Sequence, residues 1–196
     1  MRDHPPLDAE AKAIPNPLAI LGFAGLYAAV AGPALIWFEP VRTSLAASVL
    51  LGVVLVFLSA IDLAAYRLPD ALTLPLIGVG LCLCWWLRWD DVTLRALAAA
   101  VGYGALFFMA AGYRLARGWD GLGLGDAKLF AAAGSWTGLE GLPGVLLIAS
   151  VSALAAAGLA VLGGRAITAT TRMPFGPFLA IGFWLVWLYG PVTFGL

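Results

Sequence analysis

Residues 44–61 read SLAASVLLGVVLVFLSAI, an unbroken stretch without a charged side chain. A helix that crosses the hydrocarbon core of a bilayer needs roughly 20 apolar residues, within a range of about 17–25. The stretch therefore predicts a transmembrane helix. Asp62 follows it directly, so the first ionisable group after the helix stands at the expected membrane edge.

The composition of the whole chain agrees with this prediction. Its 196 residues are 62% hydrophobic and 11% charged, with a mean hydropathy of +0.96. A soluble domain carries about 25% charged residues, so the chain is expected to be an integral membrane protein. The formal net charge is zero, and nothing in the composition points to a nucleic-acid partner.

The remaining apolar stretches extend the prediction to a bundle. With 44–61, the long candidate spans are 18–38, 71–87, 94–113, 142–163 and 175–195. A shorter run, 127–138, is either a short span or a re-entrant segment, because about 1.5 Å per residue gives it little length. We expect an all-α integral membrane protein of about seven transmembrane helices, six long and one short. A polar tail, 1–17, precedes this single domain, 18–196.

Basic residues are distributed unevenly between the two sides of the predicted bundle. One side carries Arg2, Lys12, Arg67, Arg114, Arg117, Lys128, Arg165 and Arg172. The other side carries Arg42, Arg88 and Arg95. Cytoplasmic loops hold an excess of Lys and Arg, so we expect the first side, with the N-terminus, to be cytoplasmic. A re-entrant 127–138 would move Arg165 and Arg172 outside, so the rule favours a span.

Two aspartates stand at the cytoplasmic ends of predicted spans, namely Asp62 and Asp126. An ionisable residue at this depth is a functional hypothesis by default; the alternative is that each one only marks the end of a helix. Asp126 closes the stretch GLGLGD, 121–126. This stretch has neither of the glycine-rich phosphate-binding patterns, and an acid stands where the anion would bind. A phosphate site is therefore not expected.

The position of each aspartate on its own helix favours one location for a shared proton. Asp62 lies at a C-terminal end, where the helix dipole disfavours an anion, and Asp126 lies at an N-terminal end, where the dipole favours one. Two adjacent carboxylates share a proton, which we expect to reside more on Asp62. Such a pair activates water for attack on an amide without a metal, since one carboxylate accepts a proton while the other donates one.

Three motifs follow one another along the chain. The first is Asp62 in DLAAYRLPD, 62–70; the second is GLGDAKL, 123–129; the third is PFGP, 174–177. Together they resemble the type IV prepilin peptidases, a family of membrane aspartyl proteases of the GxGD class. The resemblance covers about 45–190.

The resemblance implies an activity, a location and a substrate. It implies that Asp62 and Asp126 are the catalytic pair, at the cytoplasmic face of the bacterial inner membrane. The substrates it implies are prepilins or pseudopilins of type IV pili and protein-secretion systems. Their short basic leader peptide is cut just before a hydrophobic helix, so the expected partners are this substrate and the lipid bilayer. The oligomeric state is not predicted.

The chain departs from the longer members of this family after its first predicted helix. Those members carry a cytoplasmic domain there, often with two zinc-binding C-x-x-C pairs, and they methylate the new N-terminus of the pilin. In this chain 39–43 takes that place, and the two cysteines, Cys82 and Cys84, lie in an apolar span. We expect no N-methyltransferase activity, no metal and no cofactor.

The motifs also contribute candidate substrate-binding or site-shaping residues. These are Pro69, Asp70, Gly123, Gly125, Lys128, Pro174, Phe175, Gly176 and Pro177. Each has a plainer alternative. Asp70 is expected as a helix N-cap, and Lys128 either supports the Asp126 carboxylate or reaches lipid headgroups. The glycines permit positive φ and close backbone approach. PFGP either starts a helix or presents backbone groups to an extended substrate.

Two other functions are compatible with the physical pattern alone. A small proton- or cation-coupled transporter or channel subunit would use Asp62 and Asp126 as ion sites. An inactive partner in pilus assembly would keep the fold. The ordered set of three motifs argues against the transporter, and the presence of both motif aspartates argues against the inactive partner.

Overall fold

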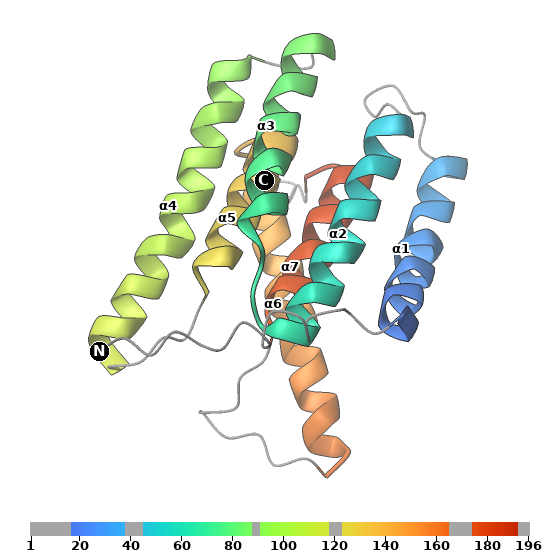
Figure 1. The fold of residues 1–196 in the computed structure, drawn as a ribbon, viewed down its shortest axis with the longest axis vertical. Coiled ribbons are helices and arrows are strands. Elements are labelled where there is room, and N and C mark those ends of the chain that lie inside the picture. Colours follow the sequence, from blue (N-terminus) through green and yellow to red (C-terminus); the bar gives the residue numbers. More distant parts are fainter. Residues whose placement is uncertain (1–16, 38–44, 88–90, 118–122, 165–173, 192–196) are drawn as a thin grey trace, which may run out of the picture.

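The computed structural model describes residues 17–37, 45–87, 91–117, 123–164 and 174–191. They form seven helices: α1 (Pro17–Trp37), α2 (Leu45–Ala65), α3 (Asp70–Leu87), α4 (Val92–Arg117), α5 (Leu124–Thr137), α6 (Gly141–Leu162) and α7 (Gly176–Tyr189). These ranges contain no strand (Figure 1). The prediction of an all-α membrane bundle is confirmed, since α2, α3, α4 and α6 are each long and apolar enough to cross a bilayer.

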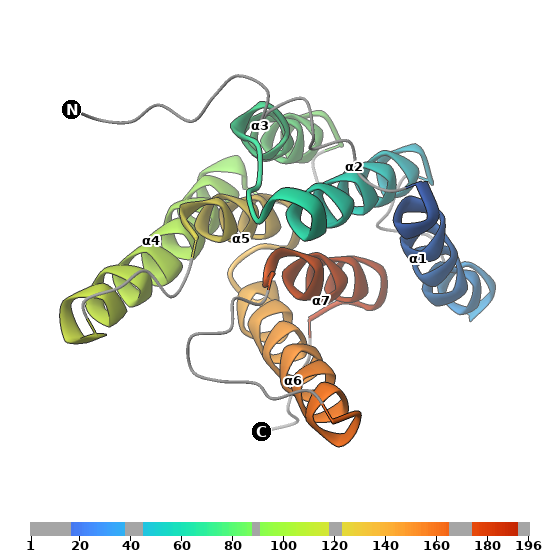
Figure 2. The same ribbon diagram turned by 60° about the horizontal axis from the view of Figure 1, so that its bottom comes forward.

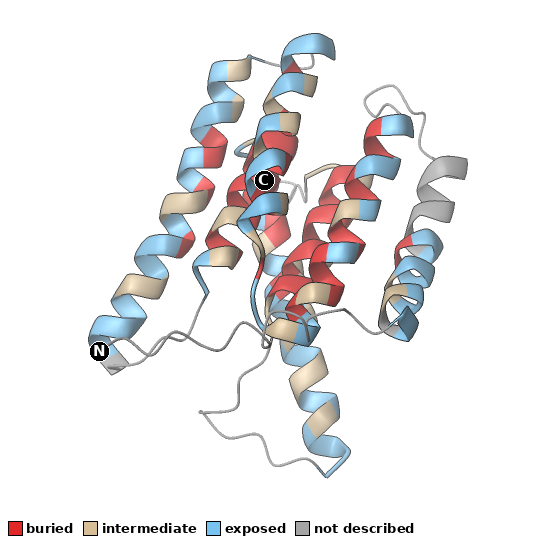
Figure 3. Cartoon of the chain, viewed as in Figure 1, coloured by how far each residue is buried: buried red, intermediate tan, exposed pale blue. Residues whose placement is uncertain are grey.

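Two short helices occupy the middle of the bundle (Figure 2). Helices α3 and α4 pack on α5, while α2 and α6 pack on α7, and α5 and α7 contact each other. Helix α1 lies at the outside, against α2 and α7. Buried residues accordingly concentrate on α5, α7 and the facing side of α2 (Figure 3). The bundle thus surrounds the helices that carry the second and third motifs.

Small residues allow α4 and α5 to approach closely. A Cβ atom on Gly134 would lie 2.5 Å from the carbonyl oxygen of Ala98, and one on Gly102 would lie 2.8 Å from that of Phe130. Small residues serve this purpose at helix interfaces within membranes, where packing rather than water exclusion drives association. The composition of α5, rich in Ala and Gly, therefore fits its central position.

Aromatic side chains fill the core at the opposite end of α5 from Asp126. The Trp136 ring lies edge-on to those of Phe183 and Trp187, with centroids 6.4 and 5.1 Å away. The Trp136 indole also donates a hydrogen bond of 2.9 Å to the carbonyl of Leu76. One side chain of α5 is thereby joined to both α7 and α3.

Helix α5 is one continuous helix of 14 residues that joins two levels of the bundle. Gly138, which ends it with φ 78, lies against the side chain of Arg95 in the first turn of α4. Arg95 also donates a hydrogen bond to the carbonyl of Trp136. Since α5 begins beside the C-terminal part of α4 and ends beside its first turn, its 14 residues run antiparallel to α4 without turning back.

Helix α4 begins beside a capping aspartate. The Asp91 carboxylate accepts hydrogen bonds from the side chain and backbone of Thr93, at 2.8 and 2.9 Å. These two bonds hold the pKa of Asp91 below its usual value. Asp91 therefore has a local structural role as the cap of α4.

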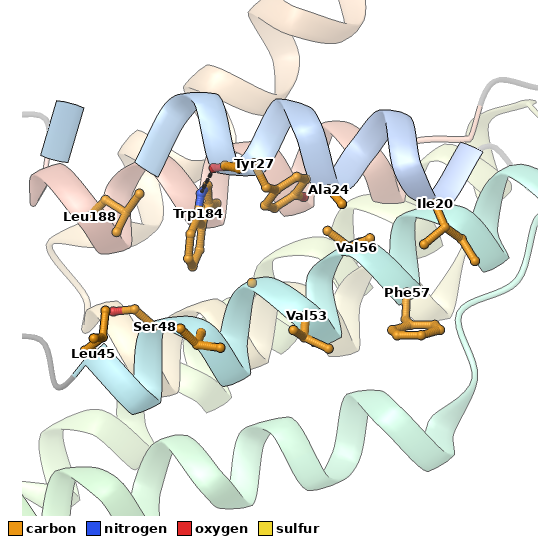
Figure 4. Close-up of a pocket in the computed structure, with 13 residues that line it drawn as sticks. Ile20, Ala24, Tyr27, Leu45, Ser48, Val53, Val56, Phe57, Trp184 and Leu188 are labelled. Atoms are coloured by element: carbon orange, nitrogen blue, oxygen red, sulfur yellow. Dashed lines mark hydrogen bonds between the residues drawn. The ribbon is translucent and has the colours of Figure 1, made fainter. Parts of the chain in front are cut away.

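An apolar cavity of about 360 Å³ separates parts of α1, α2 and α7 (Figure 4). Val53, Val56 and Phe57 line it from α2, and Trp184 lines it from α7. The indole of Trp184 donates a 3.3 Å hydrogen bond to the carbonyl of Tyr27. This bond joins α7 to α1 beside the cavity.

Candidate active site

Asp62 and Asp126 come from different helices and lie at the same end of the bundle. Asp62 is in the last turn of α2 and Asp126 is in the first turn of α5. Both are buried, with 5% and 7% of their surface exposed. They are close enough for the charge of Asp62 to act directly on Asp126. Two carboxylates 64 positions apart in sequence are thus placed together in a water-poor site.

The third motif brings the start of α7 to Asp62. The backbone N–H of Gly176 donates a 3.0 Å hydrogen bond to Asp62 Oδ2, across 114 positions of sequence. Gly176 is buried, and a Cβ atom there would lie 2.7 Å from the same oxygen. Only glycine allows this approach without displacing the carboxylate or the helix.

This contact removes the basis for expecting the proton on Asp62. The prediction considered only the helix to which each aspartate belongs. The structure places Asp62 at the C-terminal end of α2 and also against the first residue of α7, whose free N–H favours an anion. Each aspartate therefore lies at the N-terminal end of a helix, and the dipole argument no longer distinguishes them.

The glycines of GLGD have different surroundings. A Cβ atom on Gly125 would lie 2.8 Å from Cβ of Leu68, a buried residue of the α2–α3 connection. Gly123 is exposed, and a Cβ there would lie 3.5 Å from Asp126 Oδ2. Neither of these two glycines uses the positive φ that glycine permits, since Gly123 has φ −74 and Gly125 is helical, whereas Gly125 does make a close approach. Gly121 lies outside the described residues.

The connection from α2 to α3 lies against the start of α5. The carbonyl of Pro69 accepts the N–H of Thr73, so Pro69 holds the capping position and Asp70 is the first helical residue. The expected N-cap is therefore one residue earlier than Asp70. The Asp70 carboxylate instead pairs with Lys128 Nζ at 2.6 Å. Neither alternative considered for Lys128 included this ion pair.

The remaining residues of PFGP form the start of α7. Pro177 stands in its first turn, and the carbonyl of Phe175 accepts the N–H of Leu179 at 3.0 Å. This confirms the helix start. Pro174 and Phe175 are half-buried and Pro177 is buried, so the motif lies within the bundle and not in a solvated loop.

Sequence reasoning did not single out two residues of the α2–α3 connection. Tyr66 has φ 52, a conformation that residues other than glycine rarely adopt, and its N–H bonds to the carbonyl of Asp62. Leu68 packs on Gly125. No pattern in the sequence marks either residue. Within the described residues, no group of three or more His, Cys, Asp or Glu could hold a metal ion.

Comparison with known proteins gives a family match over the region of the two aspartates. The model of the type IV leader peptidase family matches residues 49–158. That range includes the first two motifs, while PFGP lies beyond it. No solved structure gives a significant match.

Curated relatives carry the name prepilin leader peptidase/N-methyltransferase. The one from Burkholderia pseudomallei is 42% identical over 154 residues, 79% of this chain and 49% of the relative. That from Aeromonas hydrophila is 42% identical over 148 residues, 74% of this chain and 49% of the relative. That from Escherichia coli is 42% identical over 125 residues, 64% of this chain and 55% of the relative.

The chain spans about half the length of these relatives. The family match nevertheless covers more than half of the chain itself and contains both buried aspartates. The chain belongs to the type IV leader peptidase family.

Proposed function

We propose that this chain is a membrane aspartyl endopeptidase that removes the short basic leader peptide of type IV prepilins or pseudopilins. The observation that carries the proposal is the meeting of Asp62 and Asp126, both buried, where the ends of α2, α5 and α7 converge. Family membership and the printed names of the relatives support the substrate class.

The proposed chemistry uses the two carboxylates as one unit. They hold one proton between them, because neighbouring like charges in a buried site do not both ionise. The charged carboxylate accepts a proton from water while the oxygen attacks the amide carbon, and the neutral one donates its proton to the carbonyl oxygen. When the C–N bond breaks, the proton taken from water passes to the leaving amine. One hydroxyl of the tetrahedral intermediate returns its proton to the carboxylate that had donated one, which restores the pair.

The site-shaping residues hold the catalytic groups and the surrounding helix ends in place for this reaction. The Gly176 N–H fixes one oxygen of Asp62, and the ion pair of Lys128 with Asp70 joins α5 to the start of α3. Gly123 is exposed beside Asp126, which leaves room for the backbone of an extended substrate. Pro69, Gly125 and the remaining residues of PFGP hold these elements in place.

The orientation that we propose puts this site at the cytoplasmic face of the bacterial inner membrane. The excess of basic residues on the same side supports it. A substrate whose hydrophobic helix is embedded in the bilayer would then present its leader junction at the level of the aspartates.

A cleavage assay tests the proposal. Purified chain in detergent is mixed with a prepilin, and the products are identified by mass spectrometry. We expect a single cut between the basic leader and the hydrophobic helix. Intact substrate across a panel of prepilins and pseudopilins would contradict the proposal. Proton or cation flux through the reconstituted chain would then favour the transporter alternative.

We also propose that the chain does not methylate the processed pilin. The basis is the short internal segment 38–44, between α1 and α2, which contains no cysteine. Incubation with a processed pilin and radiolabelled S-adenosylmethionine is expected to give no transfer above background. A member of the family that does methylate serves as the positive control, and labelled pilin from this chain would contradict the expectation.

A further inference from the structure

A second cavity lies beside the aspartate pair. It has a volume of about 550 Å³ and forms where the α2–α3 connection, the C-terminal part of α4 and the start of α5 meet. Two arginines line it, Arg67 from the connection and Arg114 from α4. Gly123, next to Asp126, forms part of its wall. The cavity is therefore contiguous with the segment that carries the second motif.

The cavity extends from the membrane edge into the hydrocarbon region. Arg114 lies in the last turn of α4, and Phe107, another lining residue, is seven positions earlier. At about 1.5 Å per residue, Phe107 lies about 10 Å deeper than Arg114. The other lining residues of this part, Ala110, Ala111 and Leu124, are apolar. The cavity thus has a cationic mouth and an apolar floor.

The charge of the lining selects an anion. The described residues that line the cavity include two guanidinium groups and no carboxylate. Guanidinium groups bind phosphate through paired N–H donors. The N-terminal end of α5, at Leu124, adds the positive end of a helix dipole.

We infer that this cavity binds an anionic phospholipid of the leaflet that it faces, with the phosphate between Arg67 and Arg114 and the upper acyl chain against Phe107. Basic pockets between transmembrane helices bind the headgroups of such lipids. The inference rests on the cavity and its depth, and it does not require the proposed peptidase activity. A bound lipid would brace Gly123 and the start of α5 against the α2–α3 connection.

Native mass spectrometry of the full chain tests the assignment. The protein is purified in a neutral detergent and titrated with phosphatidylglycerol, and the bound lipid is counted. The Arg67→Gln/Arg114→Gln variant is expected to bind about thirtyfold more weakly, since each basic residue near an anionic lipid contributes about a factor of five. Arg67→Gln and Arg114→Gln alone should each bind the lipid about fivefold more weakly than wild type.

Matched variants separate this site from general surface charge. Arg67→Lys/Arg114→Lys keeps both charges and should stay within about fivefold of wild type, because lysine also binds phosphate as a point charge. Arg165→Gln removes a cation that the sequence assigns to the same side of the membrane, and it should leave lipid binding unchanged. Circular dichroism establishes whether each variant is folded. If the double Gln variant is unfolded, the lipid affinities of the two single variants are compared with that of wild type instead.

Several results would overturn the inference. One is wild-type affinity in the folded Gln variants. Another is equal weakening by Arg165→Gln or by Arg67→Lys/Arg114→Lys. Equally tight binding of diacylglycerol, which lacks a phosphate, would show an apolar site only. Displacement of the lipid by millimolar inorganic phosphate would assign the cavity to a soluble anion. Displacement by an acidic peptide would assign it to a polypeptide.

Discussion

At the scale of single residues, the contact between Gly176 and Asp62 is the most constrained feature of the site. The N–H of Gly176 bonds to the carboxylate, and there is no space for a Cβ atom. We predict that Gly176→Ala displaces the carboxylate and lowers the cleavage rate about 100-fold, as misplacement of a catalytic group by about 1 Å can do. The measurement is the rate of prepilin cleavage by protein shown to be folded.

Gly78→Ala is the matched control for this substitution. Gly78 lies within α3, and a Cβ atom there would meet nothing within 4 Å. Alanine is the better helix former by roughly 0.5–1 kcal/mol, so this variant should cleave at the wild-type rate and be no less stable. An active Gly176→Ala enzyme would show that the contact with Asp62 does not position the carboxylate.

The two aspartates could be identified from sequence, whereas their surroundings could not. Each aspartate interrupts or borders an apolar stretch, and the cost of a charge at that depth marks it in a single sequence. The bond from Gly176 joins positions 114 residues apart. It depends on which helix ends meet, and helical periodicity carries no information about that. The ion pair of Asp70 with Lys128 escaped prediction for the same reason.

At the scale of helices, the close crossing of α4 and α5 sets the position of Asp126. We predict that Gly134→Ala is destabilising by about 1–3 kcal/mol, because the added methyl group would lie 2.5 Å from the carbonyl oxygen of Ala98. Thermal unfolding in detergent measures the change. Gly104→Ala, on α4, is the control, since its methyl group would make only an ordinary contact with Phe108. Equal stability of both variants would contradict this packing.

The limits of the helices were predictable where apolar stretches end at charges or breakers, and less so elsewhere. Helix α2 continues to Ala65, one turn beyond the predicted end, because Asp62 finds a partner within the bundle and does not end the helix. Helix α5 starts at Leu124, three residues before the predicted run 127–138, so Gly125 lies inside the helix. Helix α7 ends at Tyr189, before Gly190 with φ 86, which leaves it shorter than predicted.

At the scale of the whole molecule, the orientation that we propose from the basic residues can be tested by labelling. On a Cys82→Ala/Cys84→Ala background, single cysteines replace Leu115, at the end of α4, or Glu140, between α5 and α6. A membrane-impermeant maleimide applied to intact spheroplasts should label the cysteine at 140. The cysteine at 115 should react only after permeabilisation.

The reverse labelling pattern would show that the bundle has the opposite orientation, with Asp62 and Asp126 on the periplasmic side. Labelling of both positions only after permeabilisation would contradict the expectation that α5 crosses the membrane. The fold class needed little beyond composition and span length, because a bilayer allows few solutions. The order of helices around α5 and α7 depends instead on small residues at specific contacts, such as Gly134 against Ala98.

The most direct test of the central claim is a double-mutant cycle on the two aspartates. Asp62→Asn and Asp126→Asn should each reduce the rate of prepilin cleavage about 10²–10⁴-fold, the usual contribution of general acid–base catalysis. The double variant should lose little more, because groups that act as a unit are not additive. Asp91→Asn, at the far end of α4, is the control and should cleave normally. Wild-type cleavage by either single variant, or fully additive losses in the double variant, would contradict the paired site.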